Sequence, residues 1–218
     1  HGFKPDATSI LLDAENQTIY AITPDQIKIH DGAKLCDRIA KLIPDDMLKS
    51  ATFDFDNIAD ADTENLCVGW GLACYDFNAY KAKTKPKPVL VLSENSKTLP
   101  VFSKVASIFA LRDLINTPAN DLGPEEIEKT VKELAKQHEA TVKVVKDQKQ
   151  LEKDFPLVFT VGKASPRKPR MIELNWGNAK NPKVTLVDKG VVFDTGGRAV
   201  KASQYRRLMQ KDMGGAAP

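Results

Sequence analysis

The sequence lacks a long apolar run. None of its hydrophobic stretches approaches the roughly 20 residues of a membrane-spanning helix, so no membrane association is expected. A strong charge of one sign is also missing, because 32 lysines and arginines against 29 aspartates and glutamates leave a net charge of +3. With the basic residues scattered, we expect no nucleic-acid partner. The G-x-x-x-x-G-K pattern of a phosphate-binding loop does not occur, which argues against a P-loop nucleotide hydrolase.

Cysteine is scarce. Cys36, Cys67 and Cys74 are an odd number and lack the spacing of metal ligands. Cys67 and Cys74 lie seven residues apart on one face of an expected helix, which predicts burial as small apolar residues. This usage suits a reducing compartment, and no signal peptide is recognisable, so the cytoplasm is the expected location. The sequence begins at His1 rather than Met, so it is compatible with a segment that was removed before this residue.

The remaining composition is that of an ordinary globular protein, with 42% hydrophobic and 28% charged residues. Short apolar runs alternate with helical patterns, which predicts an α/β fold. We expect a non-catalytic N-terminal α/β domain over 1–98, a linker helix over 99–117, and the first part of a second α/β domain with a mixed sheet over 118–218. The expected strands are 9–13, 18–22, 51–55, 88–92, 141–145, 171–175, 184–187 and 191–193, and the expected helices are 31–42, 60–75, 100–116, a helix from Pro124, and 154–162.

Chemistry-bearing residues gather near the end of the chain. Asp194 directly follows the apolar run V-V-F, which is expected to be a strand. Its carboxylate would then lie at the carboxyl end of that strand, where open α/β sheets bind their ligands. A metal-activated hydrolase needs carboxylates that hold ions and a cation that faces the developing oxyanion. Asp194 and Asp212 suit the first role and Lys201 the second, whereas Lys189 would first have to lose its proton. The residues alone are also compatible with an alternative interpretation, in which these side chains form surface salt bridges at the edge of a sheet.

Four segments together resemble the cytosolic leucyl aminopeptidase family, whose members are two-metal exopeptidases. The residues around the candidate site read D-K-G, F-D-T-G-G, Lys201 and M-Q-K-D-M-G-G-A-A, in the same frame as the family's signature. Similar stretches are R-D-L-I-N-T-P-A-N-D-L-G-P at 112–124, V-G-K-A-S-P-R-K-P-R at 161–170 and G-W-G-L-A-C-Y-D-F at 69–77. The chain is therefore identified as a member of this family, part of whose catalytic domain it contains.

The resemblance implies roles for five residues. Lys189, Asp194 and Asp212 match metal ligands, with Asp194 bridging two ions, and Lys201 matches the lysine that stabilises the oxyanion. Met209 matches a residue that lines the pocket for the N-terminal side chain. The family pattern also implies two divalent ions (manganese, zinc or possibly magnesium), metal-activated water, peptide substrates and a homohexamer.

Departures from the family pattern bear on activity. The family's N-T-D-A-E-G-R segment, with two further carboxylate ligands and an arginine, would follow Pro218. Asp188 replaces a glycine beside Lys189 and is expected to tether it as an ammonium. We therefore expect this chain alone to be inactive; the alternative is a truncated or decayed paralogue that acts as a binding or assembly subunit. Four further departures are expected to add bulk or positive charge near the substrate pocket: Arg198, Tyr205, Arg206 and Arg207.

Overall fold

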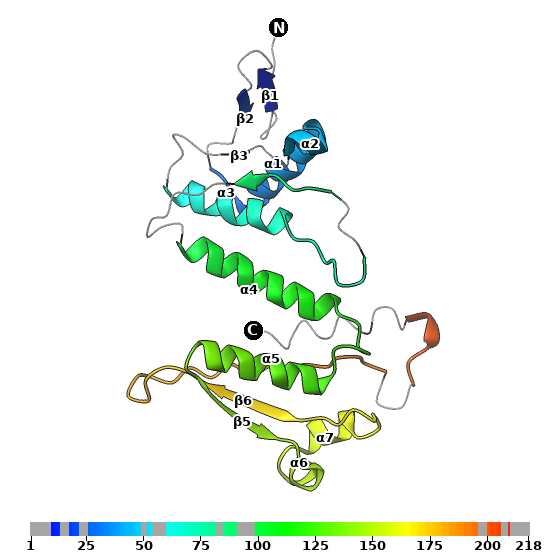
Figure 1. The fold of residues 1–218 in the computed structure, drawn as a ribbon. Helices are drawn as coiled ribbons and strands as arrows, with labels where there is room; N and C mark the ends of the chain where they lie inside the picture. The colour runs from blue at the N-terminus through cyan, green and yellow to red at the C-terminus, as the bar shows by residue number, and fades with distance from the viewer. Residues whose placement is uncertain are drawn as a thin grey trace. The chain divides into compact units, whose positions relative to one another are not determined.

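The computed structural model divides the chain into two compact units, His1–Arg112 and Asp113–Pro218 (Figure 1). Helices and short strands occur in both units, which confirms the predicted α/β class. Within the described part of the chain, no helix combines the length and the apolar character needed to cross a membrane. The structure describes residues 10–13, 18–21, 26–48, 52–53, 60–81, 85–90, 99–195, 200–205 and 209.

The first unit combines short strand pairs with longer helices. One strand pair is antiparallel, β1 with β2, and another is parallel, β3 with β4. The four strands predicted in this unit are confirmed among the described residues, and the predicted strand residues 9, 22, 51, 54–55 and 91–92 lie outside the described part of the chain. The elements are β1 (Ile10–Asp13), β2 (Thr18–Ala21), α1 (Ile29–Leu42), α2 (Asp45–Leu48), β3 (Thr52–Phe53), α3 (Asp60–Ala73), β4 (Val89–Leu90) and α4 (Leu99–Asn116), of which α4 continues into the second unit.

Helix α1 begins two residues before the predicted start at Asp31. Lys28 is the N-cap residue, and its backbone N–H donates a hydrogen bond of 2.9 Å to Oδ2 of Asp31. An acidic side chain in the third helical position often accepts the N–H of the capping residue in this way. Asp31 therefore supports the start of the helix from inside its first turn.

Helices α1 and α3 cross closely at two glycines. A Cβ atom on Gly32 would lie 2.2 Å from the carbonyl oxygen of Leu66, and one on Gly69 would lie 1.8 Å from that of Ile29. Both distances are far below van der Waals contact, so only glycine permits this approach of the two backbones. The close crossing buries the main core of this unit, which comprises Ile27, Leu35, Cys36, Ile39, Ile43, Leu48, Leu66 and Trp70.

The second unit is built on an antiparallel strand pair with a helix beside it. Strands β5 and β6 pair in register from Thr141 opposite Asn175 to Val145 opposite Met171, and α5 contacts both strands (Figure 1). The predicted bounds of both strands and the predicted start of α5 at Pro124 are confirmed. The elements are α5 (Pro124–Gln137), β5 (Thr141–Val145), α6 (Gln148–Asp154), α7 (Pro156–Gly162) and β6 (Met171–Asn175).

The structure contradicts the strands predicted at 184–187 and 191–193. Residues 176–195 contain no strand, and the side chain of Val187 is 86% exposed. A strand is stable only where a neighbouring strand pairs with its backbone groups, and an apolar sequence does not supply that partner. The mixed sheet predicted for this unit is therefore replaced, in the described residues, by the antiparallel β5–β6 pair.

The helix predicted over 154–162 is α7, which begins two residues later at Pro156, and α6, which was not predicted, precedes it. Asp147 caps α6, its carboxylate accepting a hydrogen bond of 2.8 Å from the backbone N–H of Gln150. Phe155 then leaves the helical conformation, and α7 begins at Pro156. Proline disfavours a helical residue before it and suits the first position of a new helix, which explains both the break and the restart.

Helix α4 confirms the apolar helix predicted over 100–116. The boundary between the two compact units falls within it, after Arg112, so α4 is shared by both units. The helix ends before the T-P-A-N-D-L-G-P segment, where Thr117 Oγ1 donates a hydrogen bond of 2.6 Å to the carbonyl oxygen of Asp113. The functional domain boundaries at 98 and 118 stay a prediction.

Candidate metal and catalytic site

The candidate site lies in a stretch without regular strands, in which the structure describes Asp194 and Lys201. The ammonium group of Lys201 forms an ion pair with Oδ2 of Asp194. Backbone hydrogen bonds hold this loop: Lys201 N–H donates to the carbonyl oxygen of Thr195 at 3.1 Å, and Asp194 N–H donates to that of Met209 at 3.5 Å. The structure thus brings three of the five predicted site residues, Asp194, Lys201 and Met209, into one loop.

Lys189, the fourth predicted residue, is exposed. Oδ1 of Asp188 accepts a hydrogen bond of 3.1 Å from the backbone N–H of Lys189. The Asp188 carboxylate therefore contacts the main chain of the residue that it was expected to tether, and tethering of the ammonium stays a prediction. Tyr205 is exposed. Outside the described residues lie Asp212 and the departures Arg198, Arg206 and Arg207.

The described residues alone do not complete a two-metal centre. Divalent ions that bind oxygen need about six ligand positions each, mostly from carboxylates, carbonyls and water. Among the described residues, no group of three or more His, Cys, Asp or Glu side chains is placed to hold a metal ion. In the loop described above, Asp194 is the carboxylate, and its charge is balanced by Lys201. This arrangement matches the salt-bridge alternative that the residues alone left open, although in a loop and not at a sheet edge.

A second polar cluster, which the sequence did not predict, joins α5 to the turn before β6. Arg170 forms ion pairs with Glu125 and Glu128, and Arg167 forms ion pairs with Glu125 and Glu126. The side chains of Arg170 and Glu128 are 9% and 8% exposed, so this pair is nearly excluded from water. We call these five residues the arginine–glutamate cluster. The sequence feature that could have predicted this cluster is the pair of oppositely charged segments E-E-I-E at 125–128 and R-K-P-R at 167–170.

Two glutamates of this cluster have lowered carboxyl pKa values. The pKa of Glu128 falls chiefly because Lys132 donates a hydrogen bond to its carboxylate, with a further contribution from Arg170. The pKa of Glu126 falls chiefly because the backbone N–H of Gly123 donates a hydrogen bond of 2.7 Å to it. Both interactions favour the ionised carboxylate, so the cluster carries fixed charges at neutral pH and acts as a structural tie.

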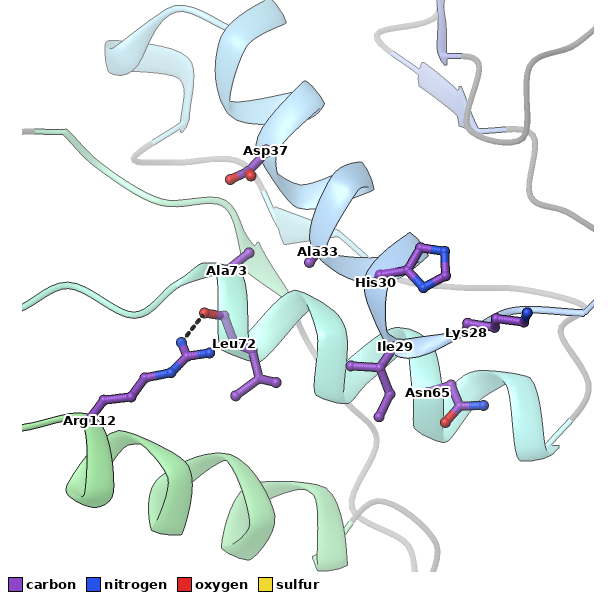
Figure 2. Close-up of a pocket in the computed structure, with 9 residues that line it drawn as sticks. All are labelled: Lys28, Ile29, His30, Ala33, Asp37, Asn65, Leu72, Ala73 and Arg112. Carbon is purple, nitrogen blue, oxygen red and sulfur yellow. Dashed lines mark hydrogen bonds between the residues drawn. The ribbon is translucent and has the colours of Figure 1, made fainter. Parts of the chain in front are cut away.

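The first unit contains an open groove of about 660 Å³ along α1, α3 and α4 (Figure 2). Arg112 donates a hydrogen bond of 3.0 Å to the carbonyl oxygen of Leu72, and its guanidinium lies 5.2 Å from the ring centroid of Tyr75. The guanidinium is thus held by α3 and the residues that follow it. The groove mixes apolar and charged side chains and is lined by Lys28, Ile29, His30, Ala33, Asp37, Asn65, Leu72, Ala73 and Arg112.

Comparison with known proteins identifies the second half of the chain. Residues 109–218, just over half of the chain, match the model of the cytosol aminopeptidase family, catalytic domain. A probable cytosol aminopeptidase of Sinorhizobium medicae is 32% identical over 169 residues, which cover 70% of this chain and 34% of that protein. The chain thus spans about a third of the length of this curated relative.

Solved structures agree with this similarity. The cytosol aminopeptidase from Coxiella burnetii, a crystal structure at 1.8 Å, is 36% identical and superposes with a TM-score of 0.82, over 96% of this chain and 45% of the other. The bottromycin maturation enzyme BotP, solved in complex with Mn, shares the fold at 22% identity, with a TM-score of 0.76 over 96% of this chain and 48% of its own. The motifs around Asp194, the matched family model and the Coxiella structure converge, and the chain belongs to the cytosol aminopeptidase family.

Proposed function

We propose that this chain forms part of a metal-dependent aminopeptidase that releases N-terminal residues from peptides. The observation that carries the proposal is the Asp194–Lys201 pair, which lies inside the segment that matches the family's catalytic domain. The chain covers 45% of the Coxiella enzyme, so the activity belongs to an assembly of this segment with further catalytic residues. The described residues alone do not complete a metal centre, and we expect the isolated chain to be inactive.

The residue roles in this proposal follow the family resemblance. Lys189, Asp194 and Asp212 are assigned as metal ligands, Lys201 as the cation that stabilises the oxyanion, and Met209 as part of the substrate pocket. Support comes from the shared loop of Asp194, Lys201 and Met209, which keeps the carboxylate and the cation within contact.

The proposal extends to cofactors, partners and location. We propose two divalent ions, of manganese, zinc or magnesium, and manganese has the support of a related fold that was solved with Mn. Peptides are the proposed substrates and a homohexamer the proposed assembly, in the cytoplasm, without a nucleic-acid or membrane partner. Support for these points is the family membership and the weak net charge of +3.

A first experiment measures hydrolysis of leucyl-p-nitroanilide by the isolated chain with added Mn²⁺, together with its metal content by mass spectrometry. We expect no turnover and substoichiometric metal, because the described loop offers one carboxylate that is already paired with a lysine. Turnover that a chelator abolishes would show that the isolated chain is active and that our expectation of inactivity is wrong.

A second experiment fuses the chain to the part of the Coxiella enzyme that it does not cover. If the chain is a catalytic segment, the chimera hydrolyses the substrate in the presence of Mn²⁺, and Asp194→Asn abolishes the activity. Asp154→Asn is the matched control, since this exposed carboxylate at the end of α6 has no role in the proposal. A folded chimera without metal or activity would instead support the binding or assembly subunit.

A further inference from the structure

Cys36 and Cys74 lie side by side although 38 residues separate them in the chain. Cys36 lies in α1 and Cys74 directly follows α3, and their Sγ atoms are 3.8 Å apart. A disulfide bond has a sulfur–sulfur distance of about 2.0 Å. A shift of about 1.8 Å would therefore bring the two sulfurs to bonding distance. Both cysteines belong to the first unit, whereas the candidate site belongs to the second.

The two thiols differ in exposure and acidity. Cys36 is fully buried, whereas Cys74 is half-buried. A hydrogen bond from Cys36 lowers the pKa of Cys74, and the charge of Lys87 lowers it further, against burial and the charge of Asp37. The same hydrogen bond, with burial, raises the pKa of Cys36. Cys74 is thus the thiol that ionises first, and Cys36 keeps its proton beside it.

The position of Cys74 allows the movement that bonding requires. Cys74 lies one residue beyond the end of α3, where its N–H contacts two carbonyl oxygens, of Trp70 at 3.2 Å and of Gly71 at 3.0 Å. Its Sγ atom lies 3.7 Å from the carbonyl oxygen of Pro88. A residue in such a terminal turn adjusts its backbone more easily than one inside a helix.

We propose that Cys36 and Cys74 form a reversible oxidation site that peroxide converts into a disulfide between α1 and the end of α3. The Cys74 thiolate attacks one peroxide oxygen, the O–O bond breaks, and the departing hydroxide takes a proton to become water. The sulfur of Cys36 then attacks the resulting sulfenic acid of Cys74, the S–S bond forms, and the S–O bond breaks. The departing hydroxide takes the proton of Cys36, so two thiols and one hydrogen peroxide give one disulfide and two waters.

Cys67 supplies an internal control. It is 2% exposed, and burial raises its pKa to about 11. Its packing against Val68 and Val101 places it in a separate apolar cluster. Oxidation of the folded chain is therefore expected to spare Cys67, whereas in the unfolded chain Cys67 is accessible and pairs readily with nearby Cys74.

The experiment treats the reduced chain with hydrogen peroxide, alkylates the remaining thiols and maps disulfide-linked peptides by mass spectrometry. We expect the loss of two thiols and two hydrogen atoms per chain, a linkage between the peptides of Cys36 and Cys74, and reversal by dithiothreitol. The variant Cys67→Ala should behave in the same way. In guanidinium chloride, where the fold is lost, linkages to Cys67 should appear, with Cys67–Cys74 favoured because it closes the shortest loop.

Two variants separate the roles of the sulfurs. In Cys36→Ala, Cys74 should react with dimedone as a persistent sulfenic acid, and its alkylation should need a higher pH because the donor is gone. In Cys74→Ala, we expect Cys36 to stay reduced. Retention of all three thiols by the folded wild-type chain, or linkages to Cys67 as frequent as in guanidinium chloride, would overturn the proposal. This outcome does not depend on whether the variants fold, since the wild-type chain decides it.

Discussion

The ammonium group of Lys201 forms an ion pair with the carboxylate of Asp194, seven residues earlier in the chain. Both groups are partly exposed, at 42% and 26%, and the loop that holds them is closed by backbone hydrogen bonds. The two side chains therefore meet because the backbone folds back, and water weakens their attraction. The pair neutralises the carboxylate without making the loop strongly dependent on it.

We expect the substitution Lys201→Met to change the free energy of unfolding by less than about 1 kcal/mol, because exposed ion pairs contribute little. Urea denaturation of the variant and of the wild-type chain measures the difference. Lys149→Met, on the exposed surface of α6, serves as the control for the loss of a lysine. A loss of several kcal/mol that the control does not show would mean that the pair supports the fold of the loop.

The buried pair of Arg170 and Glu128 should behave differently. Removing Arg170 leaves the largely buried Glu128 carboxylate with Lys132 as its close partner, so we expect Arg170→Met to destabilise the chain by about 1–3 kcal/mol. The double variant with Glu128→Gln should lose less than the sum of the single changes. Lys129→Met is a matched control on the same helix, because its pair with Glu133 is exposed, with a separation of 3.9 Å. Equal effects of Arg170→Met and Lys129→Met would contradict the structural role of the arginine–glutamate cluster.

Stability should fall in acid partly through Glu128. The pKa of this carboxyl is lowered in the folded chain, so the folded state binds its proton less readily than the unfolded state. Its contribution is therefore fully present above the ordinary carboxyl pKa of about 4.3 and is lost as the pH falls through the lower, folded value. Urea denaturation at a series of pH values from neutral to acidic measures this contribution. The free energy of unfolding should fall steeply with pH for the wild-type chain and less steeply for Glu128→Gln. If Glu133→Gln, the exposed control, has the same profile as Glu128→Gln, the assignment to Glu128 is wrong.

The close crossing of α1 and α3 predicts a specific intolerance of side chains. In Gly69→Ala the new Cβ atom would lie 1.8 Å from a backbone oxygen, which cannot move without shifting the helix. We expect the free energy of unfolding to fall by about 1–3 kcal/mol or more, as in other overpacked cores. Gly71→Ala, in the same helix, is the control, since its Cβ atom would meet a side-chain methyl of Val105 at 2.8 Å. Thermal unfolding followed by circular dichroism compares the two variants. Equal unfolding midpoints for Gly69→Ala and Gly71→Ala would argue against the close crossing of α1 and α3.

Local signals predicted most of the helices and several of the strands. The start of α5 at Pro124 was recognisable because proline suits the first helical position and acidic residues follow it. The bounds of β5 and β6 followed from short apolar runs between turn residues. The same reasoning failed at 184–187 and 191–193, because an apolar run forms a strand only where another strand pairs with it.

The candidate site could be predicted only in part. The motif around Asp194 identified the family and brought Asp194 and Lys201 into one hypothesis, and the structure places these two side chains in contact. The roles assigned to Lys189, Met209 and Asp212 stay predictions. The arginine–glutamate cluster was missed because its two segments are about 42 residues apart and each reads locally as a solvated charge run.

By itself the sequence determined the family, most of the longer helices and the identity of the residues proposed for catalysis, because these depend on motifs and on periodicity along the chain. Only the tertiary structure decided that Cys36 meets Cys74 and that Arg170 meets Glu128. Such contacts depend on how distant helices and turns pack, and packing is set by the shapes of whole surfaces, such as the glycine-lined crossing of α1 and α3, which a local pattern does not contain.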